Sequence, residues 1–201
     1  MNSRMPSVSA ILLAAGRSSR MGTLKALLPW RETSLVRYQT ETLLNAGIDD
    51  ISVILGYKAS ELSKELSSYN VKTVINKAYE SGKCSSIKAG MAAISPSSTG
   101  VVIAAVDQPL LLNVIRQLYK FHGEQPAAII IPAFKGKRGH PLLIPEQFYP
   151  ELCCISEQTQ GLRHFLRNRQ NEIATVEINE PSILLNINEQ ADYQAACWED
   201  S

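Results

Sequence analysis

The residues best suited to chemistry lie in a short loop that follows an aliphatic run near the N-terminus. The loop carries Arg17, Arg20 and Lys25, and the chain contains no acidic residue before Glu32. Small residues such as Gly16 let backbone N–H groups approach phosphate oxygens, and the cations neutralise phosphate charge. The loop therefore predicts a polyphosphate site, with solvated arginines in a plain turn as the alternative.

Two common phosphate-binding motifs do not fit this loop. The motif GxxxxGK[ST] needs a lysine after its second glycine, but Thr23 follows Gly22. The motif GxGxxG needs a glycine two residues after Gly16, where this chain has Ser18. The loop is therefore a phosphate site of a different kind.

A carboxylate follows the most apolar strand expected in the chain, residues 101–106. Asp107 comes directly after this strand and is followed by Gln108 and Pro109. A carboxylate at the carboxyl end of a central strand can hold Mg²⁺ beside phosphates. The alternative is an N-cap for the helix expected after Pro109. A cap tolerates Asn or Ser, whereas a metal ligand needs the charge.

Two further loops are polar and could border a ligand. The first, residues 80–90, opens a helix that Ser85 or Ser86 can cap, and the N-terminus of a helix favours an acceptor or an anion. A plain capped helix is the alternative there. The second, residues 136–141, is flexible and cationic and contains Arg138. It suits an anionic acceptor substrate.

Apolar runs and helical periodicity alternate along the first two thirds of the chain. We expect strands over 8–13, 51–55, 71–75, 101–106 and 127–131, and helices over 35–46, 60–66, 85–94 and 110–122. Less regular elements follow, with strands over 140–144 and 173–178 and helices over 161–168 and 189–198. Continuous apolar strands that alternate with helices predict a single-domain three-layer α/β/α fold over residues 1–201, with a mostly parallel sheet. Ligands of such sheets bind beyond the carboxyl ends of the strands, where the polar loops lie.

Composition narrows the classes of partner. The chain has 201 residues, of which 45% are hydrophobic, and a formal net charge of +1, which gives no electrostatic basis for binding nucleic acid or an anionic membrane. No apolar run is long enough to span a bilayer, and the first residues lack the apolar core of a signal peptide. We therefore expect a cytoplasmic protein. Its four cysteines form no CxxC pair and are interpreted as small apolar residues.

Residues 13–29 read LAAGRSSRMGTLKALLP, which matches every fixed position of the pattern LAAGxSxRMGxxKxLLP. The chain thereby resembles the MobA-like NTP transferase family, the nucleotidyltransferases of the molybdenum-cofactor type. The resemblance implies a Rossmann-like fold of the nucleotide-diphospho-sugar transferase type. It also implies a nucleotide-binding set made of Leu13, Ala14, Ala15, Gly16, Arg17, Arg20, Lys25, Gly82, Ser85 and Ser86.

The same resemblance assigns the remaining site residues. Asp107 stands at the family's metal-binding Asp-x-Pro, and Asn186 and Asn188 stand where the family returns its chain to the metal. Turn chemistry is the alternative for the two asparagines. Acceptor binding is implied for Arg138, Gly139 and His140.

One position near the nucleotide base departs from the family. Lys83 replaces a residue that is usually apolar, and the neighbouring Cys84 has no evident chemical role.

The function that the resemblance implies is transfer of CMP from CTP to the phosphate of molybdopterin, with Mg²⁺ as cofactor and release of pyrophosphate. Lys25, Arg20 and Asp107 would be the catalytic residues, and Ala15 favours the cytidylyl branch over the guanylyl branch. The product would serve molybdenum hydroxylases, which are possible protein partners. Three alternatives stay open: a nucleotidyltransferase for a sugar phosphate or methylerythritol phosphate, a non-catalytic cofactor chaperone, and a generic α/β binding protein.

Overall fold

A computed structural model describes residues 7–19 and 21–199 of the chain. The strands are β1 (Val8–Ala14), β2 (Pro29–Trp30), β3 (Thr33–Ser34), β4 (Asp50–Leu55), β5 (Lys72–Ile75), β6 (Gly100–Ala105), β7 (Ile129–Phe134), β8 (Lys137–Arg138), β9 (Leu142–Pro145) and β10 (Ile173–Glu177). The α-helices are α1 (Leu35–Asn45), α2 (Ala59–Glu65), α3 (Lys83–Met91), α4 (Leu112–Glu124), α5 (Tyr149–Cys154), α6 (Gly161–Asn168) and α7 (Gln190–Glu199). Short 3₁₀ helices are η1 (Lys25–Leu27), η2 (Tyr79–Ser81), η3 (Glu146–Phe148), η4 (Glu157–Thr159), η5 (Gln170–Glu172) and η6 (Pro181–Leu184).

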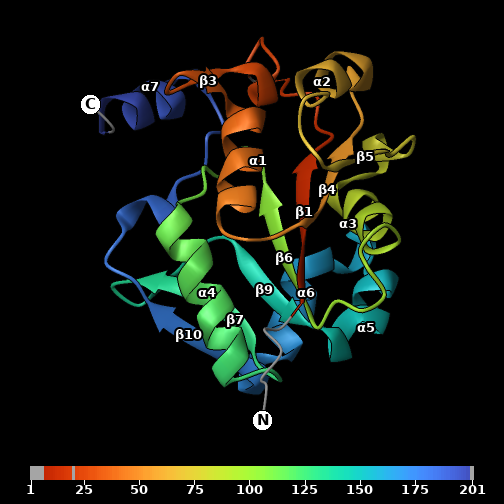
Figure 1. Cartoon of the computed structure of the whole chain (residues 1–201), viewed down its shortest axis with the longest axis vertical. Coiled ribbons are helices and arrows are strands. Elements are labelled where there is room, and N and C mark those ends of the chain that lie inside the picture. The colour runs from red at the N-terminus through yellow and green to blue at the C-terminus, as the bar shows by residue number, and fades with distance from the viewer. Residues whose placement is uncertain (1–6, 20, 200–201) are drawn as a thin grey trace.

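The central sheet brings the carboxyl ends of its parallel strands to one edge. Its order is β10-β7-β9-β6-β1-β4-β5, with β8 paired to β7. Strand β1 lies between β6 and β4 and pairs in parallel with both, while β9 runs antiparallel to its two neighbours. The carboxyl ends of β1, β4 and β6 therefore point the same way, toward the top of Figure 1.

Two hydrophobic layers explain why every position of β1 except Ser9 is apolar. Side chains alternate between the faces of a strand, and Ala10 and Leu12 join one core cluster while Ile11 and Leu13 join the other. The first cluster lies under α1 and α4, which Figure 1 shows in front of the sheet. The second lies under α3, α5 and α6 on the opposite face. The expected three-layer α/β/α fold with a mostly parallel sheet is confirmed.

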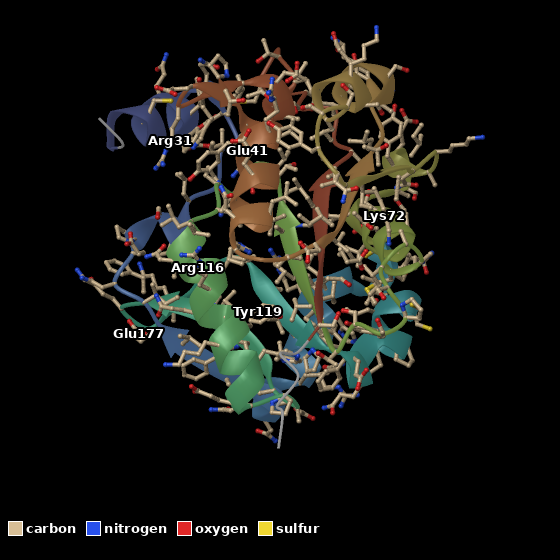
Figure 2. The ribbon with its side chains drawn as sticks, viewed as in Figure 1. Arg31, Glu41, Lys72, Arg116, Tyr119 and Glu177 are labelled. Carbon is tan, nitrogen blue, oxygen red and sulfur yellow. The ribbon has the colours of Figure 1, made fainter. Side chains whose placement is uncertain are left out.

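The two helices of the front layer are also linked by a polar contact. Arg116 of α4, labelled in Figure 2, donates a hydrogen bond of 3.0 Å to the carbonyl oxygen of Asn45 at the end of α1. Helix α1 in turn contacts η1, which begins at Lys25. One helix therefore connects the cationic loop to the rest of the front layer.

Several element boundaries differ from the expectation. Strand β7 begins at Ile129 rather than 127, β9 begins at Leu142 rather than 140, and α3 begins at Lys83 rather than 85. The small hairpin β2–β3 was not expected, because each of its strands has only two residues and too short an apolar pattern. Within the described residues, no helix is long and apolar enough to span a membrane.

Buried His122 gives the first prediction, a loss of stability in acid. The side chain is 0% exposed, and its Nδ1 has no hydrogen-bond partner in the part of the chain that the structure describes. Burial lowers the pKa of His122 below 6.5. Between the folded and unfolded pKa values the unfolded chain therefore binds more protons, so the free energy of unfolding decreases as the pH falls below the unfolded value.

One histidine can change the free energy of unfolding by at most about 1.4 kcal/mol per pH unit. We expect the urea midpoint of the wild-type protein to fall between about pH 7 and pH 5. His122→Gln, which cannot titrate, should show a smaller slope whatever its stability at neutral pH. Equal slopes for the two proteins would contradict the assignment to His122.

Candidate active site

A cavity of about 340 Å³ opens at the carboxyl ends of β1 and β6. Its lining comes from four parts of the sequence: the end of β1, the cationic loop with η1, the start of α3, and the end of β6. The lining residues are Leu13, Ala14, Ala15, Gly16, Ser18, Leu24, Lys25, Ala26, Tyr79, Gly82, Lys83, Ser86, Ala105, Val106 and Asp107. The structure thus gathers in one cavity the loop after β1, two expected residues near the base, and Asp107.

The side chains of Lys25 and Asp107 meet inside this cavity. Lys25 Nζ lies 3.3 Å from Asp107 Oδ2, and the two side chains are 11% and 31% exposed. Ser18 fixes the backbone of the loop, because its Oγ accepts a hydrogen bond of 2.9 Å from the N–H of Lys25. Its carbonyl oxygen accepts another, also of 2.9 Å, from Met21. A cation and a carboxylate separated by 82 positions thus share one site.

Asp107 does not cap the helix that follows it, which contradicts the alternative reading of this residue. Helix α4 begins at Leu112 and its N-cap is Leu111, four positions beyond Asp107. The carboxylate instead contacts Lys25, and the carbonyl oxygen of Asp107 accepts a hydrogen bond of 2.8 Å from the N–H of Ile187. The charge is therefore presented to the cavity.

Gln39 of α1 positions the strand end that carries Asp107, a role that no local sequence pattern indicates. Gln39 is 0% exposed, and its Nε2 donates to the carbonyl oxygens of Ala105 at 3.2 Å and Val106 at 2.7 Å. Antiparallel pairing between β6 and β9 stops at Ile103, two residues earlier. Gln39 thus supplies donors where the sheet no longer does.

The second prediction tests this support. Gln39→Leu keeps the apolar volume but removes both donors, so we expect a loss of about 1–3 kcal/mol in unfolding free energy. A displaced Asp107 should also lower kcat of the nucleotidyl transfer proposed below by about tenfold or more. The measurements are urea unfolding and pyrophosphate release.

Tyr38→Phe is the matched control on the same helix. It removes one hydrogen bond of 2.9 Å to the carbonyl oxygen of Leu110, beyond Asp107, so a smaller effect on kcat is expected. A destabilised Gln39→Leu protein with wild-type kcat would show that Gln39 supports the fold without positioning Asp107.

The N-terminus of α3 is built differently from the expectation. Its N-cap is Gly82, with φ 109°, so neither Ser85 nor Ser86 caps the helix. Both serine hydroxyls instead accept hydrogen bonds from Asn76 Nδ2, at 2.8 and 3.0 Å. Ser86 lines the cavity, whereas Ser85 donates to backbone carbonyl oxygens beside it.

A distant carboxylate completes this helix end. Glu157 Oε1 accepts a hydrogen bond of 2.6 Å from the N–H of Cys84, and a Cβ on Gly82 would lie 2.5 Å from the Glu157 side chain. Burial, followed by hydrogen bonding to Glu157, raises the pKa of the Cys84 thiol to about 11. Cys84 is therefore a protonated, buried thiol near neutral pH rather than a nucleophile.

The other two cations of the loop differ in placement. Arg20 lies outside the described residues. Arg17 does not line the cavity: its guanidinium forms an ion pair with Glu80 and lies 5.7 Å from the Tyr57 ring centroid and 6.0 Å from that of Tyr79. It lines a neighbouring hollow of about 820 Å³.

None of the residues of the expected acceptor loop, 136–141, is among the residues that line the cavity. Arg138 Nη1 donates to Gln170 Oε1 at 2.8 Å, away from the lining residues. Gly139 is packed against Ile183, whose carbonyl oxygen would lie 2.5 Å from an added Cβ. His140 is anchored by its N–H to the same carbonyl oxygen, at 2.9 Å.

The imidazole of His140 lies close to the charges of the cavity. Burial is the main cause that lowers its pKa, to about 4; Lys83 lowers it further and Asp107 opposes the shift. His140 is therefore neutral near pH 7.

The residues around Asp107 fit a divalent metal that is shared with a substrate. Asn186 and Asn188 flank Ile187, whose N–H donates a hydrogen bond to the carbonyl oxygen of Asp107. Both asparagines therefore lie beside the end of β6. Asn186 Oδ1 already accepts from Gln108 Nε2 at 2.6 Å. No group of three His, Cys, Asp or Glu side chains suited to a metal occurs among the described residues. One carboxylate with amide oxygens is what Mg²⁺ uses when substrate phosphates complete its shell.

Comparison with known proteins agrees with this geometry. The model of the MobA-like NTP transferase domain matches residues 10–174, which include most of β1, the cationic loop and Asp107. The chain belongs to the MobA-like NTP transferase family. The match runs from within β1 into β10, so it includes at least part of every strand of the central sheet.

The proteins that are similar to this chain carry different names. The chain is 30% identical over 187 residues to nicotine blue oxidoreductase of Paenarthrobacter nicotinovorans, covering 89% of this chain and 90% of that protein. It is 26% identical over 199 residues to the molybdenum cofactor cytidylyltransferase of Escherichia coli K12, covering 96% of each. A crystal structure of a Mycobacterium tuberculosis H37Rv protein has a TM-score of 0.85 at 22% identity, and the match covers 97% of this chain and 100% of that chain. That structure supports the fold.

Proposed function

We propose that this protein is a cytidylyltransferase that transfers CMP from CTP to the phosphate of an acceptor, with molybdopterin as the favoured acceptor. The observation that carries the proposal is the convergence of Lys25 and Asp107, 3.3 Å apart, on a cavity lined by Leu13 to Gly16. The similarity to the molybdenum cofactor cytidylyltransferase over 96% of the chain supports the choice of substrates.

The triphosphate would lie across the ends of β1 and β6. Backbone N–H groups near Ala14 to Gly16 approach the nucleotide, and Gly82 and Ser86 border the base. Arg20 and Lys25 hold the phosphates, with Lys25 nearest the α-phosphate. Ser18 holds the backbone of Lys25 and Asp107 holds its ammonium, so this charge needs little reorganisation when phosphate binds.

Asp107 would hold a divalent metal, proposed to be Mg²⁺, together with an amide oxygen of Asn186 or Asn188. Bound there, the metal supplies positive charge to the phosphate oxygens. A manganese complex of the Mycobacterium tuberculosis relative, with a TM-score of 0.80, supports a divalent metal in this fold. The ammonium of Lys25 holds the Asp107 carboxylate toward the cavity.

An acceptor phosphate would attack the α-phosphorus, forming one P–O bond while the bond to pyrophosphate breaks. An ionised phosphate is itself a nucleophile, so no general base is needed. The imidazole of His140 is neutral near pH 7 and, with a pKa of about 4, is a weak base. This agrees with a reaction that depends on charge and positioning rather than on proton transfer.

Thermal shift with CTP, GTP, ATP and UTP, each with Mg²⁺, tests the nucleotide. A ligand that binds only the folded state raises Tm, so CTP should give the largest rise. Pyrophosphate release with molybdopterin, methylerythritol phosphate and sugar phosphates then tests the acceptor. A Tm that none of the four nucleotides changes would refute the proposal, and CTP binding without turnover of any acceptor would favour a cofactor chaperone.

An oxidoreductase is the second candidate, because the relative with 30% identity is named nicotine blue oxidoreductase. The same protein preparation can be incubated with nicotine blue and NADH or NADPH. Loss of the dye colour with no effect of CTP on Tm would favour this function over nucleotidyl transfer.

A further inference from the structure

The start of α3 forms one wall of the cavity and is held by residues from elsewhere in the chain. Gly82, Lys83 and Ser86 belong to the cavity lining. Gly82 is the N-cap of α3, so it has no side chain that could accept from the helix. The first N–H groups of a helix have no partner inside the helix and must be satisfied from outside. The position of this wall therefore depends on contacts with other segments.

Glu157, in η4, supplies the contact at the first half of this wall. Its Oε1 accepts a hydrogen bond of 2.6 Å from the N–H of Cys84. A carboxylate at the N-terminus of a helix makes a strong, charge-assisted hydrogen bond and interacts favourably with the helix dipole. The same side chain packs on Gly82, where an added Cβ would lie 2.5 Å from Glu157 Cγ, Cδ and Oε1. Glu157 thus contacts the residues on both sides of Lys83.

The turn that carries Glu157 is itself held against α3, although Glu157 is an exposed residue. Ser156 Oγ accepts a hydrogen bond of 3.3 Å from the N–H of Gln158, and the carbonyl oxygen of Ser156 accepts one of 2.8 Å from the N–H of Gly161. Gly161 approaches α3 so closely that an added Cβ would overlap the sulfur of Cys84. The carboxylate is therefore presented to the helix from a docked turn.

The second half of the same wall is held by a different residue. Asn76 is buried directly after β5, and its Nδ2 donates to Ser85 Oγ at 2.8 Å and to Ser86 Oγ at 3.0 Å. Neither of these contacts involves Glu157. A substitution of Glu157 should therefore loosen Gly82 while Ser86 and the rest of the helix stay attached to the end of β5.

We propose that Glu157 is a positioning residue for the nucleotide base: it fixes Gly82 at the border of the base and so sets the affinity and base preference of the site. This inference rests on the proposed function, in which Gly82 and Ser86 border the base. Glu157 does not line the cavity and acts through Gly82. The phosphates are assigned to Lys25, on a separate segment of the lining. Loss of Glu157 should therefore weaken binding of a nucleotide but not of pyrophosphate.

The test compares ligands that contain a base with one that does not. Calorimetry measures the binding of CTP, GTP and inorganic pyrophosphate, each with Mg²⁺, to the full chain of the wild type, Glu157→Ala, Glu157→Gln and Glu124→Gln. Glutamine retains an acceptor oxygen at the same reach, whereas alanine removes it. Glu124 is an exposed glutamate at the end of α4 that does not line the cavity, which makes it the matched control.

We expect Glu157→Ala to weaken CTP binding by about tenfold or more, and Glu157→Gln to weaken it by about threefold or less. Pyrophosphate affinity should stay within about twofold of the wild type in both variants, and Glu124→Gln should match the wild type for every ligand. The preference for CTP over GTP should decrease in Glu157→Ala, because a loosened wall discriminates less between rings of different size. In turnover, KM for CTP should rise while kcat at saturating CTP is retained.

Two results would overturn the inference alone: wild-type CTP affinity in Glu157→Ala, or an equal loss of CTP and pyrophosphate affinity in the folded variant. The second would show that Glu157 supports the cavity as a whole rather than the base. If Glu157→Ala does not fold, Glu157→Asp replaces it, because aspartate keeps the charge but is one methylene shorter. A wild type that binds pyrophosphate but no nucleotide would instead refute the proposed function, and this inference with it.

Discussion

Lys25→Ala should lower kcat for pyrophosphate release by about 10²- to 10³-fold, as expected when one donor to the transition state is removed. The reason is local: Lys25 is 11% exposed, held by Ser18, and aimed at the carboxylate that would hold the metal. Its charge is fixed before substrate arrives, so little energy is spent on reorganisation. The measurement is steady-state release of pyrophosphate at saturating CTP.

Two variants make the result on Lys25 specific. Lys120→Ala removes a lysine that is 78% exposed on α4 and does not line the cavity, so this variant should retain wild-type kcat. Lys25→Arg retains the charge with a different shape and should retain part of the activity. A folded Lys25→Ala protein with wild-type turnover would remove Lys25 from the catalytic set.

Asp107→Asn should lower kcat by at least about 10²-fold, because several kcal/mol of metal-dependent stabilisation would be lost. The substitution preserves shape and removes only the charge. Since Asp107 caps no helix and its described side-chain partner is Lys25, folding should change by no more than about 1 kcal/mol. Electron paramagnetic resonance of Mn²⁺, with and without CTP, measures the loss of metal binding directly.

Asp49→Asn is the control for the loss of a carboxylate. Asp49 is exposed and precedes β4 at the amino end of the strand, so it lies at the opposite edge of the sheet from the cavity. It should leave Mn²⁺ binding and kcat unchanged. If Asp107→Asn bound Mn²⁺ as tightly as the wild type, the metal would have to be held elsewhere.

The local pattern of the sequence determined the layers and the position of the main site. The residues of β1 other than Ser9 are apolar because the strand is covered on both faces, and this pattern is visible in the sequence without knowing which strands are its neighbours. The cationic loop after β1 and the carboxylate after β6 follow neighbouring parallel strands, so both must lie at the same edge of the sheet. The pairing of Lys25 with Asp107 at that edge agrees with this reasoning.

Contacts between distant residues were decided by the tertiary structure alone. Helix α3 begins at Lys83 rather than at residue 85. At this helix end the N–H of Cys84 donates a hydrogen bond to Glu157, which is 73 positions from Cys84 in the sequence. Gln39 supports a strand end 67 positions away. Neither residue has a local signature, because a glutamate in a loop and a glutamine on a helix are ordinary surface residues until the chain packs. Burial and hydrogen bonding depend on which elements become neighbours, and the order of the strands sets that.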